Sequence, residues 1–205
     1  MGGFPSERLW NHVLELAGGR RVLVDVAASP NWTNPLQLAG DLTELSFYPW
    51  PPENLRELAL SSDVIVVCGG NTANMLAVWR VHGFDAILRE AWDAGVVLTG
   101  WSAGMICWFE AGVTDSFGPQ LEGMRDGLGF LPGSACPHYD GEELRRPVYT
   151  QLVRGGFPAG IALDDGVAAR YLGRELREIV TDRPDAGGYR IGPESEETLP
   201  VLRLE

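Results

Sequence analysis

The segment GWSAG, residues 100–104, places one serine between two glycines where an apolar strand pattern meets a helical pattern. A serine hydroxyl becomes a nucleophile once a positioned base takes its proton. In parallel α/β sheets, ligands bind at the carboxyl ends of the strands, and a Gly-x-Ser-x-Gly turn exposes its serine at that edge. Serine is also a common residue at the start of a helix. The pattern therefore leaves two interpretations of Ser102 open, a nucleophile and a helix cap.

Histidine is the usual base for such a serine, and the chain has three histidines. His12 and His82 fall within helical patterns, and His82 comes in the last turn before a glycine, where the helix dipole favours an imidazole. His138 lies instead in a loop segment, from which it can reach across the carboxyl edge of the sheet. All sixteen basic residues are arginine, so lysine-based mechanisms are excluded. These observations favour His138 as the base.

A carboxylate must hold the imidazole in the correct tautomer and stabilise its charged form. Four aspartates are candidates: Asp115, Asp140 beside the histidine, and the adjacent Asp164 and Asp165. The adjacent pair ends an expected strand and so belongs to the same edge of the sheet as the serine. Spacing alone does not choose among the four.

The oxygen of a substrate carbonyl gains negative charge during attack, and two backbone N–H groups can stabilise it. Ala103, directly after the serine, offers one such group. Gly69 or Gly70, at the end of a neighbouring apolar segment, offers the other. We therefore expect an oxyanion site between these two turns.

Hydrophobic periodicity and turn residues predict the elements that position these groups. We expect helices over 6–19, with Ser6 as the cap, and over 51–62, 72–83, 85–94 and 102–112. We expect strands over 21–28, 43–48, 63–68, 95–100, 160–164, 166–172, 178–182 and 188–192, and a loop from 113 to 135.

Alternating strands and helices indicate an α/β protein with a parallel sheet covered on both faces. The predicted fold is three-layered and flavodoxin-like, with a mostly parallel sheet and helices on both sides. The length of 205 residues fits one domain, and no linker composition or internal repeat divides residues 1–205.

Composition limits the partners and the compartment. A formal net charge of −12 disfavours nucleic acid, because phosphate binding needs clustered basic residues. No apolar stretch is long enough to cross a membrane, and the first residues lack the pattern of a secretory signal. The three cysteines, Cys68, Cys107 and Cys136, match no zinc spacing, and we expect them to be reduced. We expect a cytoplasmic protein with no nucleic-acid or membrane partner.

Four segments in this order resemble the peptidase E (aspartyl dipeptidase) and cyanophycinase family. They are VVCGGNTANML, GWSAG, PGSACPHYD and GIALDDG, and they span roughly residues 63–169. The resemblance implies a serine peptidase on a fold like that of the class I glutamine amidotransferases.

By this resemblance Ser102 is the nucleophile, His138 the base, and the backbone N–H groups of Gly70 and Ala103 form the oxyanion site. The family's acid is a glutamate on the strand after the histidine, and Asp165 occupies the matching position. An aspartate is one methylene shorter, so Asp115 and Asp164 remain alternatives to Asp165.

The resemblance also implies a small peptide substrate, with dipeptides that carry an N-terminal aspartate as the expected choice. Asn71, Arg145 and Arg146 match the region that contacts substrate, and an arginine there would hold the acidic side chain. The alternative for both arginines is a structural helix start with Glu142 and Glu143 as partners. No metal or other cofactor is expected, and the chain is compatible with a homodimer.

One departure concerns the first segment, MGGFPSERLW, because family members begin with a strand before the first helix. Either the sheet has one strand fewer, or the given sequence starts late. Two other functions stay open. An esterase of the α/β-hydrolase type would use Asp115, because its order is serine, acid, histidine. A non-catalytic relative of the fold would bind a ligand and leave Ser102 unreactive.

Overall fold

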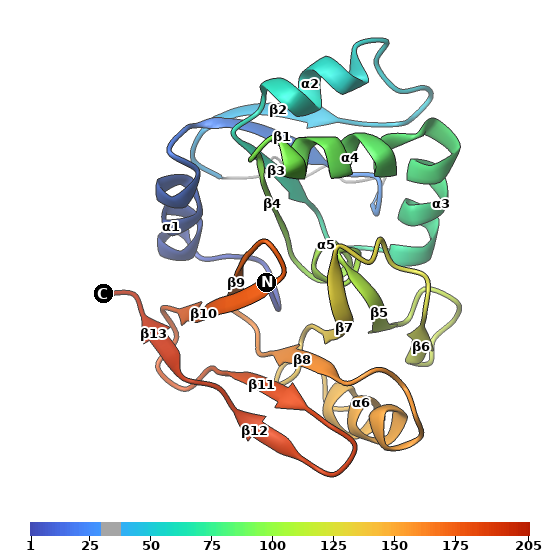
Figure 1. Cartoon of the computed structure of the whole chain (residues 1–205), viewed down its shortest axis with the longest axis vertical. Coiled ribbons are helices and arrows are strands. Elements are labelled where there is room, and N and C mark those ends of the chain that lie inside the picture. The colour runs from blue at the N-terminus through green and yellow to red at the C-terminus, as the bar shows by residue number, and fades with distance from the viewer. Residues whose placement is uncertain (30–37) are drawn as a thin grey trace.

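The computed structural model describes residues 1–29 and 38–205, and in them helices surround parallel strands (Figure 1). The helices are α1 (Glu7–Ala17), α2 (Leu55–Ser61), α3 (Thr72–His82), α4 (Phe84–Asp93), α5 (Ala103–Ile106) and α6 (Arg145–Arg154). Ser6 caps α1 as predicted, because its side chain accepts a hydrogen bond from the Leu9 N–H. Gly18 and Gly83 end α1 and α3 in the left-handed conformation that glycine adopts readily. The first regular element is thus a helix, as the sequence predicts.

The strands form three hydrogen-bonded sheets. The first, fully parallel, has the order β2 (Asp41–Leu45), β1 (Arg21–Asp25), β3 (Val64–Val67), β4 (Val97–Gly100). The second has the order β12 (Glu196–Thr198), β11 (Gly188–Ile191), β8 (Gly160–Leu163), β7 (Leu131–Cys136), β5 (Phe109–Thr114), β6 (Glu122–Met124). The third comprises β13 (Val201–Arg203), β10 (Glu175–Thr181) and β9 (Val167–Leu172). In the second sheet β5, β7 and β8 are parallel, so their carboxyl ends share one edge.

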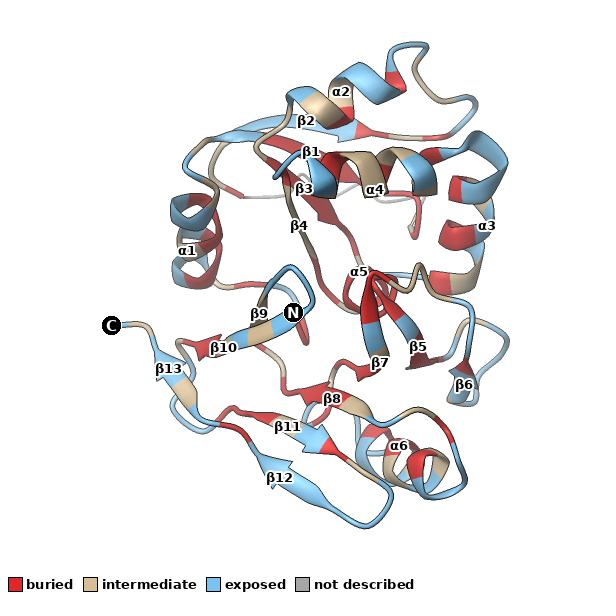
Figure 2. Cartoon of the chain, viewed as in Figure 1, coloured by how far each residue is buried: buried red, intermediate tan, exposed pale blue. Residues whose placement is uncertain are grey.

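Successive side chains of a strand point to opposite faces of its sheet, and this alternation assigns the helices to layers. Val22 and Val24 of β1 pack in the same buried cluster as residues of α1. Leu23 packs with residues of α2, α3 and α4 in a second cluster on the other face. Strands β1 and β3 are buried, whereas β2 is largely exposed at the edge of the sheet (Figure 2). The α/β fold with helices on both faces is therefore confirmed.

The helix predicted from Ser102 to Gly112 is wrong beyond its first turn. It ends at Ile106, and β5 follows from Phe109 to Thr114. Periodicity cannot distinguish a short apolar strand from a helix segment. The register of β5 against β7 also shifts after Phe109. Phe109 and Val113 are four residues apart and would share a face in a regular strand, but they pack in different buried clusters.

The loop predicted from 113 to 135 is also wrong, since it contains the end of β5, all of β6 and most of β7. Glycine and proline are frequent there and suggest turns, but the middle of the second sheet accommodates small residues. A side chain at Gly112 would lie 2.5 Å from Ile106 and 2.9 Å from the Ala135 carbonyl oxygen, so the strands approach closely. In the described residues no helix is long and apolar enough to cross a membrane.

Asp25, the last residue of β1, has a fully buried carboxyl group. One oxygen accepts a hydrogen bond from the Ala27 N–H at 2.7 Å, and the other accepts from Trp79 Nε1 at 2.8 Å. Burial raises the pKa of Asp25 from 3.8 to about 7, and the two hydrogen bonds oppose that rise. The folded state therefore holds a proton that the unfolded state releases near pH 4.

We expect Asp25 by itself to make the free energy of unfolding fall as the pH rises from about 4 to about 7, because its folded form binds the extra proton over this range. The buried Met1 amino group, whose pKa burial lowers to about 5, acts in the opposite direction above pH 5. The contribution of Asp25 is on the order of 4 kcal/mol, at about 1.4 kcal/mol for each pH unit. Urea unfolding of the wild type and of Asp25→Asn across this range measures it. The slope of the free energy of unfolding against pH should be more negative in the wild type than in the variant by about 1.4 kcal/mol for each pH unit, and equal slopes in the two proteins would contradict the assignment.

Candidate active site

Ser102 lies at the sharp turn from β4 into α5, with backbone angles φ 56° and ψ −115°. A positive φ is uncommon for a residue other than glycine and marks a strained turn. The Ser102 side chain makes no hydrogen bond that caps α5. Helix capping, the structural alternative for this residue, is therefore not what the hydroxyl does.

The glycines on either side of the serine turn allow β3 to approach it. A side chain at Gly100 or at Gly104 would lie 2.5 Å or 2.1 Å, respectively, from the Val67 carbonyl oxygen. Such distances are well inside van der Waals contact, so neither position tolerates a Cβ atom without a shift of the backbone. The Gly-x-Ser-x-Gly pattern thus reflects the packing of this turn against its neighbouring strand.

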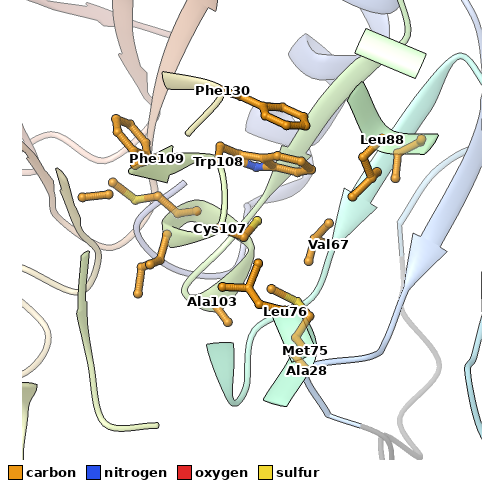
Figure 3. Packing of buried hydrophobic residues seen from close by; sticks show 14 of the residues in the cluster. Ala28, Val67, Met75, Leu76, Leu88, Ala103, Cys107, Trp108, Phe109 and Phe130 are labelled. Atoms are coloured by element: carbon orange, nitrogen blue, oxygen red, sulfur yellow. The ribbon is translucent and has the colours of Figure 1, made fainter. Parts of the chain in front are cut away.

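A buried hydrophobic cluster holds α5 in place behind Ser102. Ala103, Cys107 and Trp108 pack with Val67 and Leu76 in this cluster (Figure 3). Burial raises the pKa of the Cys107 thiol well above its usual value. The thiol next to the turn therefore stays protonated and is a poor nucleophile.

The other two cysteines are also free and buried. Burial raises the pKa of Cys68 and that of Cys136 to about 12. A thiolate nucleophile is therefore disfavoured at all three cysteines, and the Ser102 hydroxyl is the candidate nucleophile that the turn presents.

His138 follows β7 and faces the turn after the neighbouring parallel strand, β8. Its Nδ1 atom lies 2.7 Å from Oδ1 of Asp165, which is hydrogen-bond distance. The His138 side chain is 20% exposed and that of Asp165 is 39% exposed, so the pair lies at the surface of the site. The adjacent Tyr139 N–H donates to the Leu163 carbonyl and ties the two turns together.

The remaining candidate acids have other partners. Asp164 is buried and accepts hydrogen bonds from the Gly187 N–H at 2.8 Å and the Tyr189 hydroxyl at 3.2 Å. Burial raises the pKa of Asp164. Asp140 accepts from the Asp165 N–H at 2.7 Å. Asp115 is exposed beyond the end of β5. Among these aspartates, the described contacts join only Asp165 to the histidine.

Residues 1–3 connect the serine turn with the Asp165 turn. The Met1 carbonyl accepts a hydrogen bond from the Ser102 N–H at 3.4 Å. Gly3 lies against Asp165, because a Cβ atom there would be 2.4 Å from Oδ1 of the aspartate. Three residues span at most roughly 10 Å. The serine and the His138–Asp165 pair therefore belong to one edge of the molecule.

Gly69 and Gly70 follow β3 and adjoin the serine turn. A Cβ atom at Gly69 would lie 3.1 Å from the Ser102 Cβ atom. Gly70 has φ 139° and approaches Ala28 so closely that only glycine fits. Within residues 1–29 and 38–205, the N–H groups of Gly70 and Ala103 have no hydrogen-bond acceptor. As far as the described residues show, both groups are thus available to an oxygen atom of a ligand.

Asn71 caps α3, since its side-chain oxygen accepts from the Asn74 N–H at 2.9 Å. Its side-chain nitrogen donates to the Ser116 carbonyl at 2.9 Å. These contacts give the residue a structural role in joining the start of α3 to the loop after β5.

The two arginines at the start of α6 differ in burial. Arg145 is only 3% exposed and donates to the Val113 carbonyl at 2.9 Å and to Glu142 at 2.6 Å. These contacts favour the structural alternative for Arg145. Arg146 is exposed, pairs with Glu196 and lies over the ring of Tyr139 at 5.3 Å. Of the two, Arg146 is the one with a guanidinium accessible to solvent.

The other histidines lie outside this site. His12 is in α1, and the ring of His82, in α3, lies 5.4 Å from that of Phe47. In the part of the chain that the structure describes, no group of three His, Cys, Asp or Glu side chains is arranged to hold a metal ion.

An apolar cavity of about 510 Å³ lies between β4 and β9, behind the serine turn. Met1, Gly100, Trp108 and Ala169 are among its lining residues, but Ser102, His138 and Asp165 are not. The cavity is therefore separate from the edge where these three residues lie.

The parallel α/β fold and the strained serine turn together define a class of α/β protein that presents a serine at a sharp strand-to-helix turn beside its parallel sheet. The model of peptidase family S51 matches residues 33–179 of the chain. An uncharacterized peptidase of Bacillus subtilis strain 168, YgaJ, is 50% identical over 150 residues, which are 73% of this chain and 64% of that protein. The chain thus spans a little under two thirds of that relative. It belongs to peptidase family S51.

Two solved structures share the fold. A peptidase from an acI-B1 Actinobacterium has a TM-score of 0.62 and 16% identity, with 97% of this chain and 92% of that chain covered. A putative peptidase E protein from Listeria monocytogenes EGD-e has a TM-score of 0.58 and 16% identity, with 99% and 96% covered. At this identity the likeness concerns the fold alone.

Proposed function

We propose that the chain is an active serine peptidase that hydrolyses small peptides, with dipeptides that begin with aspartate as the first substrates to test. Ser102 is the nucleophile, His138 the base and Asp165 the acid. The observation that carries the proposal is the 2.7 Å hydrogen bond between His138 and Asp165. These residues lie in the turns after the adjacent strands β7 and β8, at the edge that also presents the strained serine. Membership of family S51 supports the same chemistry.

In this mechanism the Nδ1–H of His138 donates a hydrogen bond to Asp165 Oδ1, which leaves Nε2 as the acceptor for the Ser102 hydroxyl proton. The serine Oγ attacks the peptide carbonyl carbon, and the backbone N–H groups of Gly70 and Ala103 bind the developing oxyanion. The imidazolium then gives its proton to the leaving amine. Water, activated by the same imidazole, releases the acyl group from Ser102.

An acidic substrate needs a local cation, because the net charge of −12 repels anions at long range. Arg146 is the better candidate of the two arginines in α6, since Arg145 is buried against Val113 and Glu142. A substrate carboxylate would have to compete with Glu196 for the Arg146 side chain. The reduced, buried cysteines are compatible with the cytoplasm.

A panel of dipeptides that differ in the N-terminal residue tests this function, with release of free amino acid as the measurement. We expect turnover confined to N-terminal aspartate, absent in Ser102→Ala and weakened through KM in Arg146→Gln. Arg190→Gln, which breaks the exposed pair with Glu197, is the matched control. Turnover of neutral dipeptides only would keep the peptidase and reject the acidic pocket.

The esterase alternative lacks a contact that favours it, because Asp115 is exposed and the described partner of His138 is Asp165. Hydrolysis of simple esters without any dipeptide, lost in Asp115→Asn, would nevertheless revive it. The non-catalytic alternative predicts that a folded protein fails to react at Ser102 with a serine-directed phosphonate.

A further inference from the structure

The turn that carries Asp165 is held by an ion pair outside the triad. Asp140 accepts the Asp165 N–H at 2.7 Å through Oδ1. Through Oδ2 it pairs with Arg183, whose Nη2 lies 3.2 Å away. Arg183 also donates a hydrogen bond to the Asp165 carbonyl oxygen. The single ion pair thus binds both the N–H and the C=O of the residue whose carboxylate meets His138.

The backbone around Arg183 is fixed by the same turn. Thr181, at the end of β10, donates to the Gly166 carbonyl at 2.7 Å and accepts from the Arg183 N–H at 3.0 Å. Gly166 has φ 73°, and a Cβ atom there would lie 2.7 Å from Cδ of Arg183. The arginine stem therefore lies directly across the turn, and glycine leaves the space for it.

Two further glycines confine the Asp165 carboxylate. A Cβ atom at Gly3 would lie 2.4 Å from Oδ1, and one at Gly141 would lie 2.2 Å from Oδ2. The backbone of these glycines thus limits the carboxylate on two sides. An aspartate side chain has one methylene group, so its reach depends on where its backbone is held, and a small displacement breaks a 2.7 Å hydrogen bond.

We propose that Asp140 and Arg183 are positioning residues that hold the Asp165 turn so that its carboxylate stays on His138 Nδ1. The proposal rests on the proposed function, in which Asp165 is the triad acid. Neither residue contacts the described serine turn, so both act through Asp165. A misplacement of about 1 Å in a catalytic group lowers a rate by roughly 100-fold, which sets the scale of the effect.

Asp140→Ala and Arg183→Gln test the proposal kinetically. We expect kcat to fall by about 10- to 100-fold while KM stays within about twofold, because the substrate contacts are intact. Arg183→Lys should regain part of the loss, since an ammonium group can still pair with Asp140 but reproduces less of the two-sided contact. An exposed ion pair contributes little to stability, so urea midpoints should barely change.

The matched control is Arg170→Gln, which breaks the ion pair between Arg170 and Glu178. The Arg170 and Glu178 side chains are 41% and 24% exposed, close to the 47% and 34% of Arg183 and Asp140. The Arg170–Glu178 pair joins β9 to β10 without contacting the Asp165 turn. We expect wild-type kcat in this control, and an equal loss there would overturn the proposal.

A second measurement does not depend on turnover. The hydrogen-bonded Nδ1 proton of His138 should give a far-downfield proton NMR signal, assigned by its absence in His138→Ala. We expect the signal in the wild type and in Arg170→Gln, and its loss or broadening in Asp140→Ala and Arg183→Gln. An unchanged signal in both variants would overturn the proposal. If the wild type hydrolyses no peptide, the proposed function fails, and this signal still decides whether the ion pair positions Asp165.

Discussion

Ser102→Ala is expected to lower kcat for peptide hydrolysis by roughly 10⁴-fold or more, because removal of the nucleophile leaves only binding and oxyanion stabilisation. Steady-state assay of the best dipeptide measures the loss. His138→Ala should lower kcat to a similar extent, and the double variant should be no worse, because triad members act as a unit. The non-additivity separates a shared mechanism from two independent effects.

Folding of Ser102→Ala serves as its control. The Ser102 side chain caps no helix, so its removal should leave the unfolding midpoint close to that of the wild type. The residue sits at φ 56°, and the alanine variant keeps that strain. Retention of more than about one hundredth of the wild-type rate in the folded variant would show that the hydroxyl is not the nucleophile, because general-base catalysis alone contributes at least ~100-fold.

Asp165→Asn is the second change with a large expected effect, a decrease in kcat of about 10⁴-fold. An asparagine can keep the hydrogen bond to His138 but favours the wrong tautomer of the imidazole, which then has no free acceptor for the serine proton. Asp115→Asn, at an exposed position beyond β5, should keep nearly full activity. Comparison of kcat in the two variants distinguishes the peptidase order of residues from the esterase order.

Asp164→Asn provides a sharper control because it lies next to Asp165 in the chain. The Asp164 carboxylate accepts hydrogen bonds from the Gly187 N–H and the Tyr189 hydroxyl. We therefore expect Asp164→Asn to lower the free energy of unfolding and to lower kcat less than Asp165→Asn does. Urea unfolding and kinetics on the same preparation measure both quantities. A loss of kcat in Asp164→Asn that exceeds the loss in Asp165→Asn would move the acid to Asp164.

Short-range sequence patterns predicted most of the helices and strands. Ser6 and Gly18 mark the ends of α1, because a side-chain cap and a left-handed glycine are properties of a few adjacent residues. The end of α5 and the start of β5 could not be found in this way. Four helical residues followed by a bulged strand give the same apolar pattern as one longer helix.

The burial and the ion pairs of charged residues could not be predicted from the sequence either. Arg145 was a candidate to bind an acidic substrate, yet its side chain is buried and donates to the Val113 carbonyl and to Glu142. Arg183, in the segment TDRPD, gave no signal, because an arginine after a strand is common at any protein surface. Arg183 donates to the carbonyl oxygen of Asp165, 18 residues earlier in the chain, and it pairs with Asp140, which lies on a different turn.

The amino-acid sequence by itself determined the α/β class, the serine turn and the choice of Ser102 and His138 as candidates, because strand periodicity and glycine-serine spacing are local properties. Only the tertiary structure decided which aspartate meets the histidine. That choice depends on β7 and β8 lying side by side, which brings Asp165 to 2.7 Å from His138 while Asp164 points into the core. Neighbouring residues of a turn differ in direction by their backbone angles, and those angles are set by contacts with distant residues such as Asp140 and Arg183.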